Sequence, residues 1–145
     1  MNTPTDRRAF VRTAGAALLA SIAAGCAGMV VTRVTPVNGR VRLRVADHPA
    51  LANPDGALRI LPDGAAAELL VLRQSDGSHT VLSSVCTHRG CTVDAHGARL
   101  VCPCHGSTYD RTGRVLVGPA ERPLTQLRAR LTTDGILEID LGAQS

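Results

Sequence analysis

Two short stretches of the chain carry residues whose types and spacing suit a metal centre. Box 1, CTHRGC, spans residues 86–91, and box 2, CPCHGSTYD, spans residues 102–110. Each box offers one cysteine and one histidine at ligand-like spacing: Cys86, His88, Cys102 and His105. Each also carries one further cysteine, Cys91 in box 1 and Cys104 in box 2. Two thiolates and two imidazoles brought together can hold either a zinc ion or a two-iron cluster.

The spacing of the ligand pairs helps to distinguish these two kinds of site. Structural zinc sites usually separate paired ligands by two to four residues, whereas a single residue separates Cys86 from His88. A mixed [2Fe-2S] centre instead needs two cysteines on one iron and two histidines on the other. The spacing therefore favours the two-iron cluster. A zinc-stabilised binding module and a thiol-disulfide protein using Cys102 and Cys104 remain as alternatives.

Both boxes resemble the cluster-binding boxes of the Rieske [2Fe-2S] protein family almost residue for residue. The resemblance implies that Cys86 and Cys102 bind the buried iron. It also implies that His88 and His105 bind the outer iron, with their ring edges near solvent. The expected cofactor is therefore a [2Fe-2S] cluster.

The second cysteine of each box gains a role from the same resemblance. In the high-potential branch of the family these two cysteines form a disulfide, which here would join Cys91 to Cys104. By the chain-entropy model, a bond closing a loop of about a dozen residues contributes on the order of 3 kcal/mol. Because disulfides persist in oxidising compartments, this pairing also predicts a location outside the cytoplasm.

The resemblance further assigns residues that tune or cover the cluster. The hydroxyl of Ser107 is expected to point toward a bridging sulfide, and that of Tyr109 toward a ligand cysteine sulfur. Hydrogen bonds to cluster sulfurs stabilise the reduced state and raise the potential. Tyr109 is the only tyrosine of the chain. The segment VGPAERPL resembles the proline loop over the cluster, with a core of Gly118, Pro119 and Ala120.

The N-terminal residues 1–31 have the features of a targeting segment. The pair Arg7 and Arg8, followed by an uncharged stretch, resembles a twin-arginine export signal. The sequence AAGC resembles a lipoprotein cleavage box, with Cys26 as the lipidated residue. An uncleaved helical anchor and simple cleavage are the alternatives to lipidation. The sequence thus predicts an exported, membrane-associated protein.

The composition describes the rest of the chain. A length of 145 residues suits one domain, and an apolar content built on Ala, Val and Leu requires an aliphatic core. The net charge is +4, but no basic run interleaved with aromatic residues supports nucleic-acid binding. After an expected tether at 32–38, residues 39–145 form the expected domain, with its cluster-binding part at about 84–120.

That domain is expected to be an all-β, small antiparallel sandwich. Alternating or apolar runs separated by turn residues predict strands within 39–45, 68–73, 79–84, 98–102, 113–117, 124–131 and 136–141. The turn at Asp76 and Gly77 predicts a hairpin between the second and third of these strands.

The sequence therefore predicts a one-electron, proton-coupled carrier that is not a catalyst by itself. Its partner would be a quinol, as in cytochrome bc complexes, or a molybdenum oxidoreductase, as in arsenite oxidase. It would be a non-catalytic subunit or partner of such a respiratory oxidoreductase.

Overall fold

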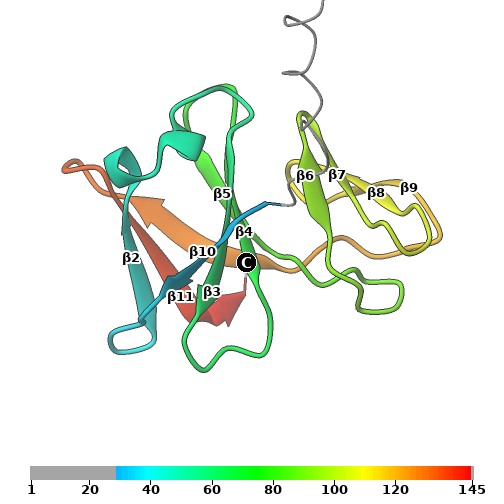
Figure 1. Cartoon of the computed structure of the whole chain (residues 1–145), viewed down its shortest axis with the longest axis horizontal. Helices are drawn as coiled ribbons and strands as arrows, with labels where there is room; N and C mark the ends of the chain where they lie inside the picture. The colour runs from blue at the N-terminus through cyan, green and yellow to red at the C-terminus, as the bar shows by residue number, and fades with distance from the viewer. Residues whose placement is uncertain (1–28, 145) are drawn as a thin grey trace, which may run out of the picture.

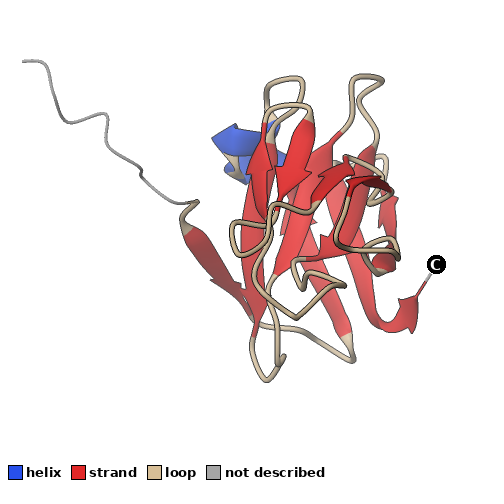
Figure 2. Cartoon of the chain, turned by 90° about the vertical axis from the view of Figure 1, so that its right-hand side faces the viewer, coloured by secondary structure: helices blue, strands red, loops and turns tan. Residues whose placement is uncertain are grey.

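The computed structural model describes residues 29–144 as two β-sheets (Figures 1 and 2). The expected signal, with Arg7, Arg8 and the lipidation candidate Cys26, lies outside the described residues. Within 29–144, no helix has the length and apolar character needed to cross a membrane. The only helical segments among these residues are two short 3-10 turns, Val45–Asp47 and Pro49–Leu51. The expected all-β class is confirmed.

The larger sheet has seven strands in the order β1-β3-β4-β5-β10-β11-β2. Their bounds are β1 (Val31–Val34), β2 (Arg40–Arg44), β3 (Ala57–Pro62), β4 (Leu69–Arg73), β5 (His79–Ser83), β10 (Gln126–Leu131) and β11 (Ile136–Gln144). All neighbours pair antiparallel except β1 and β3, which are parallel. The predicted hairpin of β4 and β5 is present, and β10 and β11 also pair antiparallel.

The smaller sheet carries the two boxes on its connections. Its four strands run in the order β6 (Asp94–His96), β7 (Arg99–Val101), β8 (Thr108–Asp110) and β9 (Val115–Val117). Box 1 lies between β5 and β6, and box 2 begins between β7 and β8. The chain then returns from β9 to β10 in the larger sheet. Figure 1 shows this smaller sheet as a separate lobe beside the larger one.

Two aliphatic cores hold the sheets, and β4 contributes to both. Leu69 and Val71 pack in the core of the larger sheet, whereas Leu70 and Leu72 pack against the smaller sheet. Because successive side chains of a strand point to opposite faces, a strand between two cores must be apolar at every position. This explains the continuous apolar run in β4, and it attaches the lobe that carries the boxes firmly to the larger sheet.

Some strands were not predicted from the pattern of apolar residues. Residues 31–34 overlap the expected tether but form β1, which pairs in parallel register with residues 59–62 of β3. Strands β3, β6 and β8 were also not among the predicted ones. β6 and β8 have three residues each, too few for a period-two pattern to be recognised.

Candidate metal centre

The two boxes fold into loops with the same backbone hydrogen bonds. The amide of Cys86 donates to the carbonyl of Cys91 (2.8 Å), and the amide of Gly90 donates back to Cys86 (2.8 Å). In box 2 the amide of Cys102 donates to Ser107 (2.8 Å), and that of Gly106 to Cys102 (3.0 Å). Both loops thus begin at a ligand candidate and turn through a glycine four residues later.

Both glycines have φ of 78°, in the left-handed region where a side chain is strained. The sequence therefore needs glycine at positions 90 and 106 for this loop. The spare cysteines are joined across the two loops. The structure contains the Cys91–Cys104 disulfide that the resemblance implied, with a sequence separation of 13. A covalent bond therefore holds the two ligand-bearing loops side by side.

Within residues 29–144, two thiols remain free, Cys86 and Cys102, and both are buried. Burial acts to raise the pKa of Cys86, but hydrogen bonds from Tyr109 and from the amides of His88 and Arg89 outweigh it and lower that pKa. Burial raises the pKa of Cys102, and the neighbouring Cys86 raises it further. The Cys86 thiol is therefore the more acidic of the two.

The two histidine rings meet at the outer end of the loops. The ring centroids of His88 and His105 are 4.8 Å apart, and the rings are nearly perpendicular. His88 is partly exposed and His105 is exposed, whereas both free cysteines are buried. The structure thus separates a buried pair of sulfur donors from a solvent-facing pair of nitrogen donors.

Tyr109 is fully buried and its hydroxyl reaches the first box. The hydroxyl lies 3.2 Å from Sγ of Cys86 and 3.1 Å from Oγ1 of Thr87, and it accepts a hydrogen bond from the amide of Thr87 (3.3 Å). The Thr87 hydroxyl donates to the carbonyl of Arg122 (2.6 Å). Since its proton is committed there, Thr87 can only accept from Tyr109, and the phenol proton is shared between Thr87 and Cys86. Burial raises the pKa of Tyr109 and keeps it a donor.

Ser107 is also fully buried, and its hydroxyl accepts a hydrogen bond from the amide of Ala120 (3.0 Å). No residue within 29–144 accepts the proton of this hydroxyl, which leaves it free to donate to a bound group. Ala120 belongs to the loop of Gly118, Pro119 and Ala120, whose Gly118–Pro119 peptide is cis. The expected covering loop is therefore attached to box 2 through Ser107.

The available donors suit a [2Fe-2S] cluster held by two cysteines and two histidines, and they do not suit a metal bound by three cysteine thiolates. Sγ atoms of Cys91, Cys102 and Cys104 lie within 4.8 Å of one another, but two of them form the disulfide and cannot bind a metal as thiolates. The donors that remain are two thiols and two imidazoles, in buried and exposed pairs. Buried hydroxyl protons at Tyr109 and Ser107 are available to sulfur acceptors.

Three supporting side chains have roles that the sequence did not indicate, although one of them, Thr87, lies within box 1. Thr87 links Tyr109 to the 117–124 segment, as described above. Arg59 of β3 donates to the carbonyl of Val93 (3.1 Å) and pairs with Asp94 of the smaller sheet.

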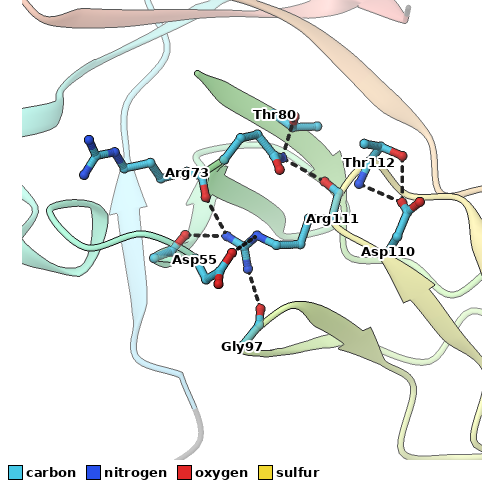
Figure 3. Close-up of polar contacts among 9 residues, drawn as sticks. Asp55, Arg73, Thr80, Gly97, Asp110, Arg111 and Thr112 are labelled. Carbon is cyan, nitrogen blue, oxygen red and sulfur yellow. Dashed lines mark hydrogen bonds and ion pairs between the residues drawn. The ribbon is translucent and has the colours of Figure 1, made fainter. Parts of the chain in front are cut away.

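Arg111, next to β8, is the third of these supporting side chains. Its guanidinium is buried, and it donates to the carbonyls of Gly97 (2.7 Å), Gly56 (2.7 Å) and Arg73 (3.1 Å). Figure 3 shows this guanidinium with the carbonyls of Gly97 and Arg73 around it. Nε of Arg111 lies 3.6 Å from Oδ1 of Asp55. Arg111 therefore joins the lobe with the boxes to the larger sheet. Since its partners are backbone carbonyls far apart in the chain, no sequence pattern could indicate them.

Comparison with known proteins places these features in a family. Residues 43–128 match the family model of the Rieske [2Fe-2S] domain. The chain is 29% identical over 140 residues to the cytochrome b6-f complex iron-sulfur subunit of Chlorobaculum tepidum, covering 94% of this chain and 76% of that protein. It is 38% identical over 86 residues to the subunit of the same name from Chlorobaculum thiosulfatiphilum, of which it spans only 46%.

Solved structures agree with the fold. The plasma membrane Rieske protein PetC3 of the cyanobacterium Synechocystis is 31% identical, with a TM-score of 0.50 over 57% of this chain and 85% of that one. A chain from the complex of oxygenase and ferredoxin in carbazole 1,9a-dioxygenase aligns over 69% of this chain and 93% of its own, with a TM-score of 0.54. Its identity is 20%, so it supports the fold alone.

Proposed function

The chain belongs to the Rieske [2Fe-2S] domain family, so its cofactor is a [2Fe-2S] cluster, and we propose that the boxes bind it for one-electron transfer. Cys86 and Cys102 would hold the buried iron as thiolates, and His88 and His105 the outer iron. When bound, such a cluster takes up and releases one electron at a time. The observation that carries this proposal is the pairing of two buried free thiols with two adjacent, solvent-facing imidazoles.

The protein's own groups set the conditions for this transfer. Tyr109 and Ser107 would donate hydrogen bonds to sulfur, which stabilises the added negative charge of the reduced state. The buried cysteines and the loop of Gly118, Pro119 and Ala120 would limit the approach of water to the inner side. The exposed histidine edges form the exit for the electron, and a proton that accompanies it would leave a ring nitrogen there.

We place the protein outside the cytoplasm and at a membrane. The Cys91–Cys104 disulfide supports an oxidising compartment. The similarity to the plasma membrane Rieske protein of Synechocystis supports membrane association, with residues 1–31 as a twin-arginine signal and Cys26 as the lipidated residue. Intact-mass analysis of membrane-extracted protein tests this, because lipidation predicts a chain that begins at Cys26 with added acyl mass. A chain that still begins at the arginines would contradict it.

For the partner, we propose a complex of the cytochrome bc or b6-f type, in which a quinol supplies the electron. The relatives carry the name of cytochrome b6-f complex iron-sulfur subunits, which supports this choice over a molybdenum oxidoreductase. In either setting the protein is a non-catalytic electron carrier, because substrate oxidation needs a site on another protein.

A reductive titration tests the proposed function. Under anaerobic conditions the purified holoprotein should take up one electron per chain, with bleaching of its visible absorption. His105→Ala should abolish the mixed-ligand spectrum. His96 is an exposed histidine on β6, and the control variant His96→Ala should leave the spectrum unchanged. If His105→Ala left spectrum and titration intact, the proposed ligand set would be wrong.

A further inference from the structure

An open groove runs beside box 1, next to the exposed edge of the centre. It has a volume of about 880 Å³ and is lined by residues from box 1, the turn after β8 and the segment leading into β10. His88 lines it, and the ring of His88 contacts that of His105. A molecule seated in this groove therefore lies directly beside the proposed electron exit.

Three arginines from three separate chain segments line the groove. They are Arg89 of box 1, Arg114 after the β8 turn and Arg122 before β10, and all three are exposed. None of the three pairs with an acidic side chain of residues 29–144 within 4.0 Å. No Asp or Glu lines the groove.

The nearest acidic residues in sequence offset this charge only in part: the charge of Arg114 helps to lower the pKa of Asp110, but the two form no ion pair within 4.0 Å. Oδ1 of Asp110 accepts hydrogen bonds from the amide and hydroxyl of Thr112 and from the amide of Arg114, all within the turn. Glu121 precedes Arg122 but does not line the groove. Within the described part of the chain, the groove is therefore lined by three arginines that form no ion pair and by no acidic side chain.

Apolar residues interrupt this charge and favour a protein segment over a free anion. Val85 lines the groove and is 38% exposed, and Pro123 and the buried Leu124 line it further along. Arginine around an apolar patch is typical of protein interfaces. Charge complementarity between partners speeds diffusional encounter and fixes orientation, which suits a partner that must bind and leave quickly.

We propose that this groove docks an acidic segment of the protein that exchanges electrons with the cluster. The proposal rests on the proposed function, and it adds the charge and the position of the partner's contact. Arg114 and Arg122 attract the acidic segment, and Val85 with Pro123 supplies the apolar contact. Docking there brings the partner's redox centre close to the rings of His88 and His105.

Stopped-flow oxidation of the reduced holoprotein tests the proposal with defined probes. Ferricyanide, an anion, takes one electron and becomes ferrocyanide; tris(phenanthroline)cobalt(III), a cation, takes one electron and becomes cobalt(II). Arg114→Glu and Arg122→Glu are compared with Arg128→Glu, a matched charge reversal on the exposed face of β10, where Arg128 also has no ion pair within 29–144. The three variants have the same net charge. A decapeptide of glutamate serves as the competing acidic segment.

At low ionic strength, Arg114→Glu and Arg122→Glu should each slow oxidation by ferricyanide by about threefold or more. Neither variant should slow oxidation by the cobalt complex appreciably. Arg128→Glu should change the rate of oxidation by ferricyanide less than about 1.5-fold, since Arg128 lines a different pocket and not the groove. The glutamate decapeptide should slow oxidation of the wild type and of Arg128→Glu by ferricyanide. It should not slow oxidation of the two groove variants. Added salt should remove all these differences.

Several results would overturn the proposal. Equal slowing by all three variants would show that only net charge matters. If inorganic phosphate at the same ionic strength slowed oxidation by ferricyanide as much as the glutamate decapeptide does, the groove would be a general anion site rather than a docking surface. Failure of the proposed function is distinguishable, because it would appear as a chain that takes up no electron at all. Failure of the docking proposal would appear in a chain that is reduced normally.

Discussion

Replacing Tyr109 by Phe should keep the cluster but lower its midpoint potential. The Tyr109 ring is fully buried, so Phe preserves the packing and deletes only the hydroxyl. That hydroxyl lies 3.2 Å from Sγ of Cys86, a distance that suits a hydrogen bond to sulfur. Reduction places more negative charge on the sulfurs, and the bond therefore stabilises the reduced form more than the oxidised form.

The size of the change follows from the strength of such bonds. A hydrogen bond to a charged group contributes about 1.5 to 3 kcal/mol, and only the difference between the two oxidation states affects the potential. We take this difference as about 1 to 2 kcal/mol. Since a tenfold change in equilibrium constant corresponds to about 59 mV for one electron, the potential should fall by about 40 to 90 mV. Ser107→Ala should lower it similarly, and the double variant further.

Protein-film voltammetry at fixed pH measures these shifts, and Thr87→Val is the control. The Thr87 hydroxyl donates to Arg122 and competes with Cys86 as an acceptor for the phenol proton. Its removal should direct that proton toward Cys86 and leave the potential equal or higher. A Tyr109→Phe potential within a few millivolts of the wild type, or a Thr87→Val loss as large as that of Tyr109→Phe, would refute the reasoning.

Three further variants test the scaffold. Cys91→Ser should hasten cluster loss on heating, followed by visible absorption, because the loops lose a cross-link worth about 3 kcal/mol; an unchanged loss rate would contradict this. Arg111→Met should lower the free energy of unfolding by about 3 to 5 kcal/mol in urea, since it leaves three carbonyls without their donor, whereas the exposed Arg99→Met should cost little. Burial, and secondarily Arg73, lowers the pKa of His79, so the unfolded chain takes up a proton there first as the pH falls below the ordinary histidine value. Wild-type stability should therefore decrease from pH 7 toward pH 5 more steeply than that of His79→Gln; parallel curves would exclude His79 as a cause.

The site was the most predictable part of the molecule. Ligand candidates, turn glycine and spare cysteine lie within a few residues of one another in each box, so local spacing carries most of the geometry. The Cys91–Cys104 bond and the contact of Tyr109 with the first box agree with what the resemblance implied. β2 was predictable for a similar reason, because its arginines alternate with the buried Val41 and Leu43.

The parts that were missed depend on contacts between distant segments. β1 forms through parallel pairing with residues 59–62, about 28 positions away, and its own four residues show no strong pattern. Arg111 binds carbonyls that belong to three different segments, and an isolated arginine gives no sign of this. The arginine groove likewise combines residues 89, 114 and 122, which are neighbours only in the folded chain.

The content and spectrum of the metal centre test the central claim most directly. The purified holoprotein should contain two irons and two sulfides per chain and no zinc. Its reduced form should give an electron paramagnetic resonance signal with the low average g-value of a cluster held by two cysteines and two histidines. Stoichiometric zinc in a colourless native preparation would contradict the assignment of Cys86, His88, Cys102 and His105 as ligands of a [2Fe-2S] cluster.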